Sequence, residues 1–213
     1  MTVPVIIESK GGALAGDLTV PDQPVGVVVF AHGSGSSRHS TRNRAVAEIL
    51  QGSGFATLLL DLLTEAEDRV DLRTRHLRFD IELLADRVST AVEQIREQAA
   101  VRGLPVGLFG ASTGAAAALV AAAHDHSIRA VVSRGGRPDL PGAALHRLQA
   151  PTLLIVGSRD EPVLDLNRQA AQQLAAPSRI EVIQGATHLF EEPGALEEVA
   201  RLAAGWLRDH VPG

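Results

Sequence analysis

A short apolar run, a Gly-x-Ser-x-Gly turn and an alanine-rich segment follow one another near the middle of the chain. The apolar run ends at Phe109, the turn spans Gly110–Gly114, and the alanines begin at Ala115. This order predicts a strand, a sharp turn and a helix, with Ser112 at the apex of the turn. Glycine on either side of the serine leaves room for the strand and the helix to approach each other. Ser112 would therefore lie where an exposed nucleophile is expected.

The rest of the chain alternates between strand-like and helix-like segments. Two opening runs, Val3–Glu8 and Ala13–Val20, predict an antiparallel hairpin. Repeated β-then-α units follow, which are typical of an α/β domain with a mostly parallel sheet. The further predicted strands are Val25–Ala31, Ala56–Leu60, Leu104–Phe109, Ile128–Ser133, Thr152–Val156 and Arg179–Ile183. The predicted helices are Thr41–Gln51, Asp80–Gln98 with Asp80 as its N-cap, Ser112–His124, Ala143–Leu148, Val163–Ala175 and Gly194–His210.

These segments predict one domain over residues 1–213, with about eight strands and helices on both faces of the sheet. Asp61–Phe79 is charged and irregular, and we expect it to form a loop. A stretch of that size is too short for a separate cap domain. The sequence therefore predicts an open or shallowly covered site that prefers small or accessible ligand groups.

Composition narrows the possible partners. A net charge of −5 and an aromatic content of 3% give no basis for binding nucleic acid or an anionic membrane. The absence of cysteine excludes disulfides, thiolate catalysis and cysteine-ligated metals. No apolar run has the length of a membrane span, and the N-terminus has no secretory leader, so we expect a cytoplasmic protein. Its oligomeric state stays open.

Two further residues complete a candidate constellation with Ser112. A serine hydroxyl needs a base to become nucleophilic, and that base needs a carboxylate to orient it. Asp160 and His188 each follow a predicted strand, and the order Ser, Asp, His is the one expected of a hydrolase with a nucleophile elbow. Glu161 and Asp139 are alternative carboxylates. Such chemistry needs neither a metal nor an organic cofactor.

Four spaced motifs carry a resemblance to a known family. They are the His32–Gly35 loop, the Gly110–Gly114 turn, Gly157–Asp160 and Gly185–His188. The chain resembles the α/β-hydrolase superfamily, and most its dienelactone-hydrolase-like branch, over nearly its whole length. The resemblance implies the α/β-hydrolase fold, with Ser112 as nucleophile, His188 as general base and acid, and Asp160 as its orienting partner. The namesake enzymes of this branch carry cysteine at the nucleophile position. Serine there favours ordinary small-molecule esters over dienelactone as substrates.

Acyl transfer also needs amide donors for the developing oxyanion. We expect one from the N–H of Thr113, at the start of the predicted helix, where the helix dipole assists it. The second is expected from the loop after Val25–Ala31, with the N–H of Ser34 preferred and that of Gly35 as the alternative.

Several arginines are predicted near the same edge of the sheet. Arg134 is the preferred candidate for binding a substrate carboxylate, because a guanidinium matches the geometry of a carboxylate. Internal pairing of Arg134 with Asp61, Asp80 or Asp139 is the alternative. Gly35 and Leu189 are further tentative substrate-binding residues.

Other functions are weighed against ester hydrolysis. Lactone or thioester hydrolysis and acyl transfer would use the same three residues. Gly33-x-Gly35 follows a predicted strand, as the first two glycines of a dinucleotide-binding motif do. Arg38 stands at the position of the third glycine that this motif needs. A binding module that keeps the fold without catalysis is the third alternative.

Overall fold

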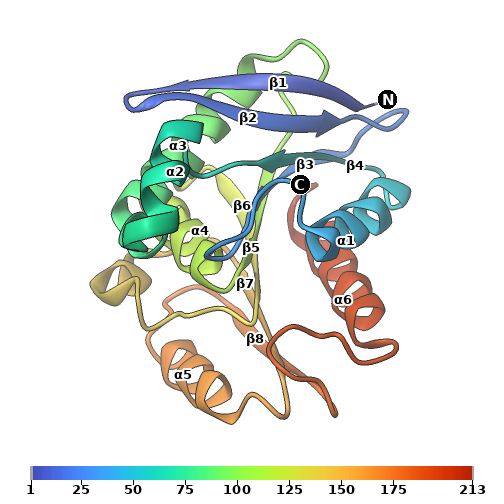
Figure 1. Ribbon diagram of the computed structural model, residues 1–213. Coiled ribbons are helices and arrows are strands. Elements are labelled where there is room, and N and C mark those ends of the chain that lie inside the picture. The colour runs from blue at the N-terminus through green and yellow to red at the C-terminus, as the bar shows by residue number, and fades with distance from the viewer. Residues whose placement is uncertain (1, 213) are drawn as a thin grey trace.

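The computed structural model describes residues 2–212, which form one eight-stranded sheet with helices on both faces (Figure 1). The strand order is β1-β2-β4-β3-β5-β6-β7-β8. The strands are β1 (Thr2–Ser9), β2 (Gly12–Thr19), β3 (Gly26–Ala31), β4 (Phe55–Leu60), β5 (Val106–Ala111), β6 (Ile128–Arg134), β7 (Thr152–Gly157) and β8 (Ser178–Ile183). The helices are α1 (Thr41–Gly52), α2 (Glu65–Thr74), α3 (Ile81–Glu97), α4 (Thr113–His124), α5 (Glu161–Ala171) and α6 (Ala195–His210), with short 3₁₀ helices η1 (Leu77–Phe79) and η2 (Gly142–Arg147).

The sheet is antiparallel at one edge and parallel elsewhere. β1 pairs antiparallel with β2, and β2 pairs antiparallel with β4, whereas the ladders from β4 through β3 to β8 are all parallel. Every residue of β3, β4, β5 and β7 is buried, as expected for parallel strands that are covered on both faces. The carboxyl ends of these strands therefore meet at one edge, where ligands bind in open α/β sheets.

The core has two halves, one on each face of the sheet. Val27 and Val29 of β3 pack with residues of α3, α4 and α5, while Val28 and Phe30 pack with residues of α1 and α6. This alternation follows from the two-residue period of a strand. In Figure 1, α1 and α6 lie together on one side of the sheet, and α3 and α4 lie on the other.

The predicted strands and most of the predicted helices are confirmed, with their ends shifted by a few residues. Asp80 caps α3 as expected, because its side chain accepts a hydrogen bond from the N–H of Leu83. The prediction of a loop over Asp61–Phe79 is wrong, since the segment contains α2 and η1. A capping box begins α2: Thr64 and Glu67 each accept a hydrogen bond from the other's backbone N–H. No helix within residues 2–212 is long and apolar enough to cross a membrane.

Candidate active site

Ser112 occupies a strained turn between β5 and α4. Its φ of 51° lies in a region that residues with side chains seldom adopt. A Cβ on Gly110 would overlap the backbone of α4, and a Cβ on Gly114 would overlap the backbone at His32. Only glycine fits at these two positions, so the expected sharp turn is present and its cause is steric.

Backbone hydrogen bonds hold this turn. The N–H of Ser112 donates to the carbonyl of Arg134 on β6 at 3.1 Å, and its own carbonyl accepts from the N–H of Ala115 at 3.1 Å. The Ser112 side chain is only partly buried, and within residues 2–212 its hydroxyl makes no hydrogen bond. The hydroxyl is thus without a hydrogen-bond partner among residues 2–212, on a fixed backbone at the carboxyl edge of the sheet.

Asp160 and His188 are joined by a short hydrogen bond. Asp160 follows β7 and His188 lies in the loop between β8 and α6, so residues that are far apart in sequence meet at one edge. The distance from Nδ1 of His188 to Oδ2 of Asp160 is 2.6 Å. With Nδ1–H donating to the carboxylate, Nε2 is left as a free acceptor. The Asp160 side chain is 14% exposed and that of His188 is 38% exposed, so a ligand can reach the imidazole.

His188 and Ser112 lie on either side of the backbone that ends β6. The carbonyl of Arg134 holds Ser112, and the next residue, Gly135, packs so closely that a Cβ on it would lie 3.5 Å from Cε1 of His188. No hydrogen bond joins Nε2 of His188 to the Ser112 hydroxyl in the described part of the chain. Catalytic hydrogen bonds of this kind are often long in unliganded enzymes and tighten when substrate binds.

The other carboxylates weighed against Asp160 lie elsewhere. Asp139 pairs with Arg137 at 2.7 Å, and Glu161 begins α5 without contacting His188. Asp160 is the carboxylate that the structure brings to His188.

The β3–α1 loop, residues 32–40, lies against the serine. A Cβ on Gly33 would be 3.2 Å from Cβ of Ser112, so the backbone that leads to Ser34 and Gly35 passes beside the nucleophile position. On the other side of Ser112, the N–H of Thr113 opens α4, where the first N–H groups have no partner within the helix. These are the amides predicted as oxyanion donors.

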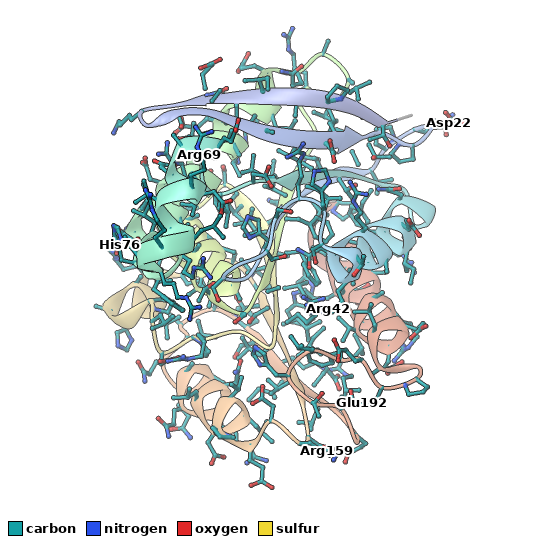
Figure 2. All side chains as sticks on the ribbon, in the orientation of Figure 1. Asp22, Arg42, Arg69, His76, Arg159 and Glu192 are labelled. Carbon is teal, nitrogen blue, oxygen red and sulfur yellow. The ribbon has the colours of Figure 1, made fainter. Side chains whose placement is uncertain are left out.

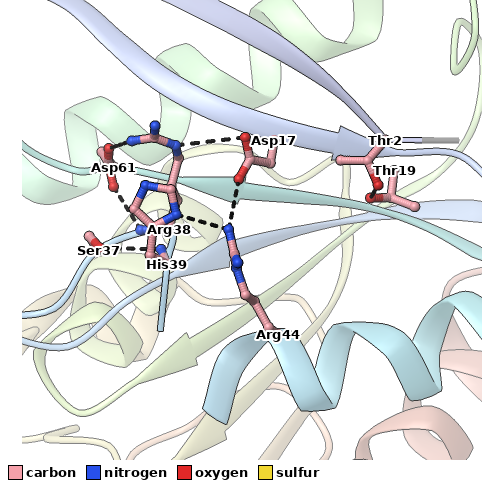
Figure 3. A network of polar contacts seen from close by, with 8 residues as sticks. All are labelled: Thr2, Asp17, Thr19, Ser37, Arg38, His39, Arg44 and Asp61. Atoms are coloured by element: carbon pink, nitrogen blue, oxygen red, sulfur yellow. Dashed lines mark hydrogen bonds and ion pairs between the residues drawn. The ribbon is translucent and has the colours of Figure 1, made fainter. Parts of the chain in front are cut away.

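Two consecutive residues after β4 hold the two ends of this loop. Asp61 Oδ1 accepts from the backbone N–H of Arg38 at 2.7 Å, and Asp61 Oδ2 pairs with the Arg38 guanidinium (Figure 3). The N–H of Leu62 donates to Nε2 of His32 at 3.1 Å, while Nδ1 of His32 donates to the carbonyl of Gly33 at 2.9 Å. Sequence reasoning assigned no such role to Leu62, because its contact is made by the backbone.

Because both nitrogens of the His32 ring are engaged, the ring is held as the neutral Nδ1–H tautomer. Burial lowers the pKa of His32 below its ordinary value, against smaller raising effects from the Gly33 carbonyl and nearby carboxylates. Outside the loop, Asp17 on β2 contacts both Arg38 at 3.7 Å and Arg44 at 3.4 Å, which extends the network to the hairpin (Figure 3).

A pocket of about 390 Å³ opens beside the β3–α1 loop. It lies between this loop, the β1–β2 hairpin, α2 and η1, and it reaches Ser34, Gly35 and Thr113. None of Ser112, Asp160 and His188 lines it, although Thr113, the residue after the serine, does. The site is therefore less open than the sequence suggested, because the segment expected to be a loop forms a helical wall.

One wall of the pocket carries a buried ion pair. Asp71 on α2 is 1% exposed and accepts from Nε of Arg78 at 2.5 Å. Burial alone would raise the pKa of Asp71, but hydrogen bonds from Arg78 outweigh it and hold that pKa below its ordinary value. Sequence reasoning missed this pair, although the capping box that starts α2 was readable.

Arg134 ends β6 with its guanidinium buried. The residue is 7% exposed, and its Nη1 has no hydrogen-bond partner among residues 2–212. Val132 packs under α1 and α6, so strand alternation directs Arg134 to the same face. Burial, with a smaller contribution from the positive charge of Arg42, lowers the pKa of Arg134 to about 10. Arg42 itself pairs with Glu191 at 3.2 Å, and Figure 2 shows it on the side of α1 and α6.

The alternative of internal pairing for Arg134 is wrong. Asp61 and Asp139 each pair with a different arginine, and Asp80 caps α3. Leu189 is 42% exposed beside His188, but neither it nor Arg134 lines the pocket. Substrate binding by these two residues stays a prediction.

The model of the dienelactone hydrolase family matches residues 14–209. The chain belongs to this family. A solved structure of dienelactone hydrolase from Anabaena variabilis is 53% identical, with a TM-score of 0.97 over 99% of this chain and 98% of that one. Est1E from Butyrivibrio proteoclasticus, at 16% identity, has a TM-score of 0.80 over 97% and 98% of the two chains, which shows a shared fold. The chain has the α/β-hydrolase fold of this family, and residues 2–212 contain no separate cap domain.

Two curated Mycobacterium tuberculosis proteins, each named a putative phosphoribosyl transferase, are 59% identical to this family member over 201 residues. The match covers 94% of this chain and 44% of each relative. The chain thus spans less than half the length of these relatives.

Proposed function

We propose that the chain is a serine hydrolase that cleaves carboxylic esters through an acyl-enzyme, with Ser112, His188 and Asp160 as its catalytic residues. The observation that carries the proposal is the 2.6 Å hydrogen bond from Nδ1 of His188 to Asp160, at the sheet edge that also presents the strained Ser112 turn. It leaves an unprotonated Nε2 available as a base at the edge of the sheet that also carries the Ser112 hydroxyl.

In the first half of the reaction, Ser112 Oγ attacks the carbonyl carbon while Nε2 of His188 takes its proton. The imidazolium, stabilised by Asp160, then donates that proton to the departing alcohol oxygen, and the acyl group stays on Ser112. In the second half, water gives a proton to Nε2 and attacks the acyl carbon. The proton returns to Ser112 Oγ as the acid leaves.

The charge that develops on the carbonyl oxygen needs donors that are already in place. We assign the N–H groups of Thr113 and Ser34 to this role, with Gly35 as the alternative to Ser34. By analogy with characterised oxyanion holes, each donor contributes about 3–4 kcal/mol to transition-state stabilisation. The bonds that Asp61 and Leu62 make to the loop support this assignment, because they fix the backbone on either side of Ser34.

Lactone hydrolysis is the second candidate, favoured by membership of the dienelactone hydrolase family. Thioester cleavage and acyl transfer to an alcohol would follow the same steps with a different leaving group or acceptor. The longer relatives are named as transferases, but this chain matches only 44% of their length, so the name describes proteins that contain much else. The residues of this chain favour acyl chemistry.

Intact-mass analysis after exposure to a fluorophosphonate tests the proposal. We expect one covalent adduct on the parent protein, none on Ser112→Ala, and much slower labelling of His188→Ala. Ser178→Ala is a matched control, since it removes an exposed hydroxyl at the start of β8, at the opposite edge of the sheet, and should label like the parent. A folded parent that forms no adduct would contradict the proposal and favour a binding module.

A further inference from the structure

We propose that the pocket beside the β3–α1 loop receives the acyl group of the substrate and that its charge selects neutral or cationic acyl groups over anionic ones. This inference rests on the proposed serine hydrolase function. It names the substrate class of that site from the pocket's walls.

The position of His188 decides which side of the ester enters the pocket. The departing oxygen must lie within hydrogen-bond reach of Nε2 of His188, because that nitrogen protonates it. The acyl chain lies on the other side of the carbonyl carbon. The pocket meets the predicted oxyanion donors Ser34 and Thr113 but includes no residue of the loop that carries His188. The acyl chain is therefore the part of the substrate that fits it.

The walls suit a chain of moderate size. Ile6, Leu63 and Leu84 supply apolar surface, and the volume of about 390 Å³ is near the lower end of small-molecule sites. Ser34, Ser36 and Ser37 of the β3–α1 loop add hydroxyl groups to the lining. A short apolar stem with a polar or charged end matches this lining.

The two arginines in the walls are already neutralised. Arg38 pairs with Asp61, and Arg78 pairs with Asp71, so neither guanidinium is left to attract an anionic group. His32 is held neutral by its two ring hydrogen bonds. A carboxylate on the acyl chain would have to displace an existing ion pair in order to bind an arginine here.

Two further carboxylates face the pocket from the first turn of α2. Glu65 pairs with Arg69 at 3.0 Å, but that arginine does not line the pocket, and Asp68 makes no ion pair within residues 2–212. Glu65 is neutralised by Arg69 as Arg38 and Arg78 are by their own partners, so the unpaired charge on this wall is the carboxylate of Asp68. Both carboxylates are exposed, the Glu65 side chain by 87%, so this charge acts through a high dielectric and is weakened by salt, and we expect about two- to threefold discrimination.

Three p-nitrophenyl esters of matched length test the inference. Their acyl groups are 4-(trimethylammonio)butanoyl, its neutral tert-butyl analogue 5,5-dimethylhexanoyl, and glutaryl, which ends in a carboxylate. At low ionic strength we expect kcat/KM for the glutaryl ester to be about two- to threefold below that of the neutral ester, and the cationic ester to equal or exceed the neutral one. The gap should shrink at high salt.

Variants assign the effect to α2. In the double variant Glu65→Gln/Asp68→Asn, the glutaryl ester should approach the neutral ester, with the comparison made within each protein so that any loss of overall activity cancels. Glu197→Gln, on the distant helix α6, should keep the parent ratio. A parent that cleaves the glutaryl ester as fast as the neutral one, or a double variant with an unchanged ratio, would overturn the inference. Failure of fluorophosphonate labelling would instead overturn the proposed hydrolase function.

Discussion

The backbone N–H of Arg38 donates to Asp61 at 2.7 Å, and the same carboxylate pairs with the Arg38 guanidinium. One side chain from the end of β4 thereby fixes the far end of the β3–α1 loop. The N–H of Leu62 fixes the near end through His32. Ser34, the preferred oxyanion donor, lies between the two anchors.

We expect Asp61→Ala to lower kcat by about 10- to 100-fold with a smaller change in KM, because the oxyanion donor loses its fixed position. Asp61→Asn should recover much of the loss, since an amide oxygen can still accept from the N–H of Arg38. Asp17→Asn removes only the outer contacts of the network and is the control. Steady-state kinetics on a neutral ester give the comparison. Equal losses in the alanine and asparagine variants would argue against positioning by the backbone bond.

The lowered pKa of His32 predicts a dependence of stability on pH. The unfolded chain takes up the proton near pH 6.5, the ordinary value, whereas the folded chain does so only at lower pH. Between these two values the unfolded state binds more protons, so stability falls as the pH falls. Urea unfolding at pH 7 and pH 5 should show a larger loss of stability for the parent than for His32→Asn. An equal loss in both proteins would exclude His32 as the source.

Arg134→Met tests the buried guanidinium. Because an unpaired buried charge is costly, we expect the variant to be at least as stable as the parent, by up to about 1–2 kcal/mol. If Arg134 binds an anion on the leaving-group side, esters of anionic alcohols will lose rate relative to neutral ones. Thermal unfolding and paired substrates measure the two effects. An unchanged rate ratio would end the substrate role of Arg134.

The steric account of the elbow predicts opposite effects for two glycine substitutions. Gly114→Ala should destabilise the protein by about 2–4 kcal/mol, because the new methyl group would overlap the backbone at His32. Gly205→Ala, within α6, has no atom within 4 Å of the new Cβ and should stabilise by about 0.5–1 kcal/mol. Urea titration of both variants gives the comparison. A neutral Gly114→Ala would show that the turn can relax.

Most of the sheet and the elbow could be predicted because their patterns are local. The run that ends at Phe109 is buried on both faces, and the turn at Ser112 needs its glycines whatever surrounds it. Asp160 could be favoured over Asp139 and Glu161 from its place after a strand. Parallel strands bring such positions to one edge.

What could not be predicted depends on contacts between distant segments. α2 has few buried residues, so its apolar periodicity is weak. The capping box at its start is the clearest sequence signal for this helix. That Arg134 has no ion-pair partner among residues 2–212 could not be predicted, because it follows from its three candidate carboxylates bonding elsewhere. Leu62 fixes the loop through its backbone N–H, which every residue except proline has, so the sequence gives no sign of this contact.

The proposed acyl pocket and the proposed catalytic residues come from different stretches of the chain. Apart from Thr113, every residue that lines the pocket precedes residue 85, whereas Ser112, Asp160 and His188 all follow α3. A single crossover between two family members in the connection from α3 to β5 would therefore exchange the substrate preference and retain the reactive groups. The linear order of the chain allows the acyl preference, together with the backbone donor of Ser34, to be inherited separately from the three reactive side chains.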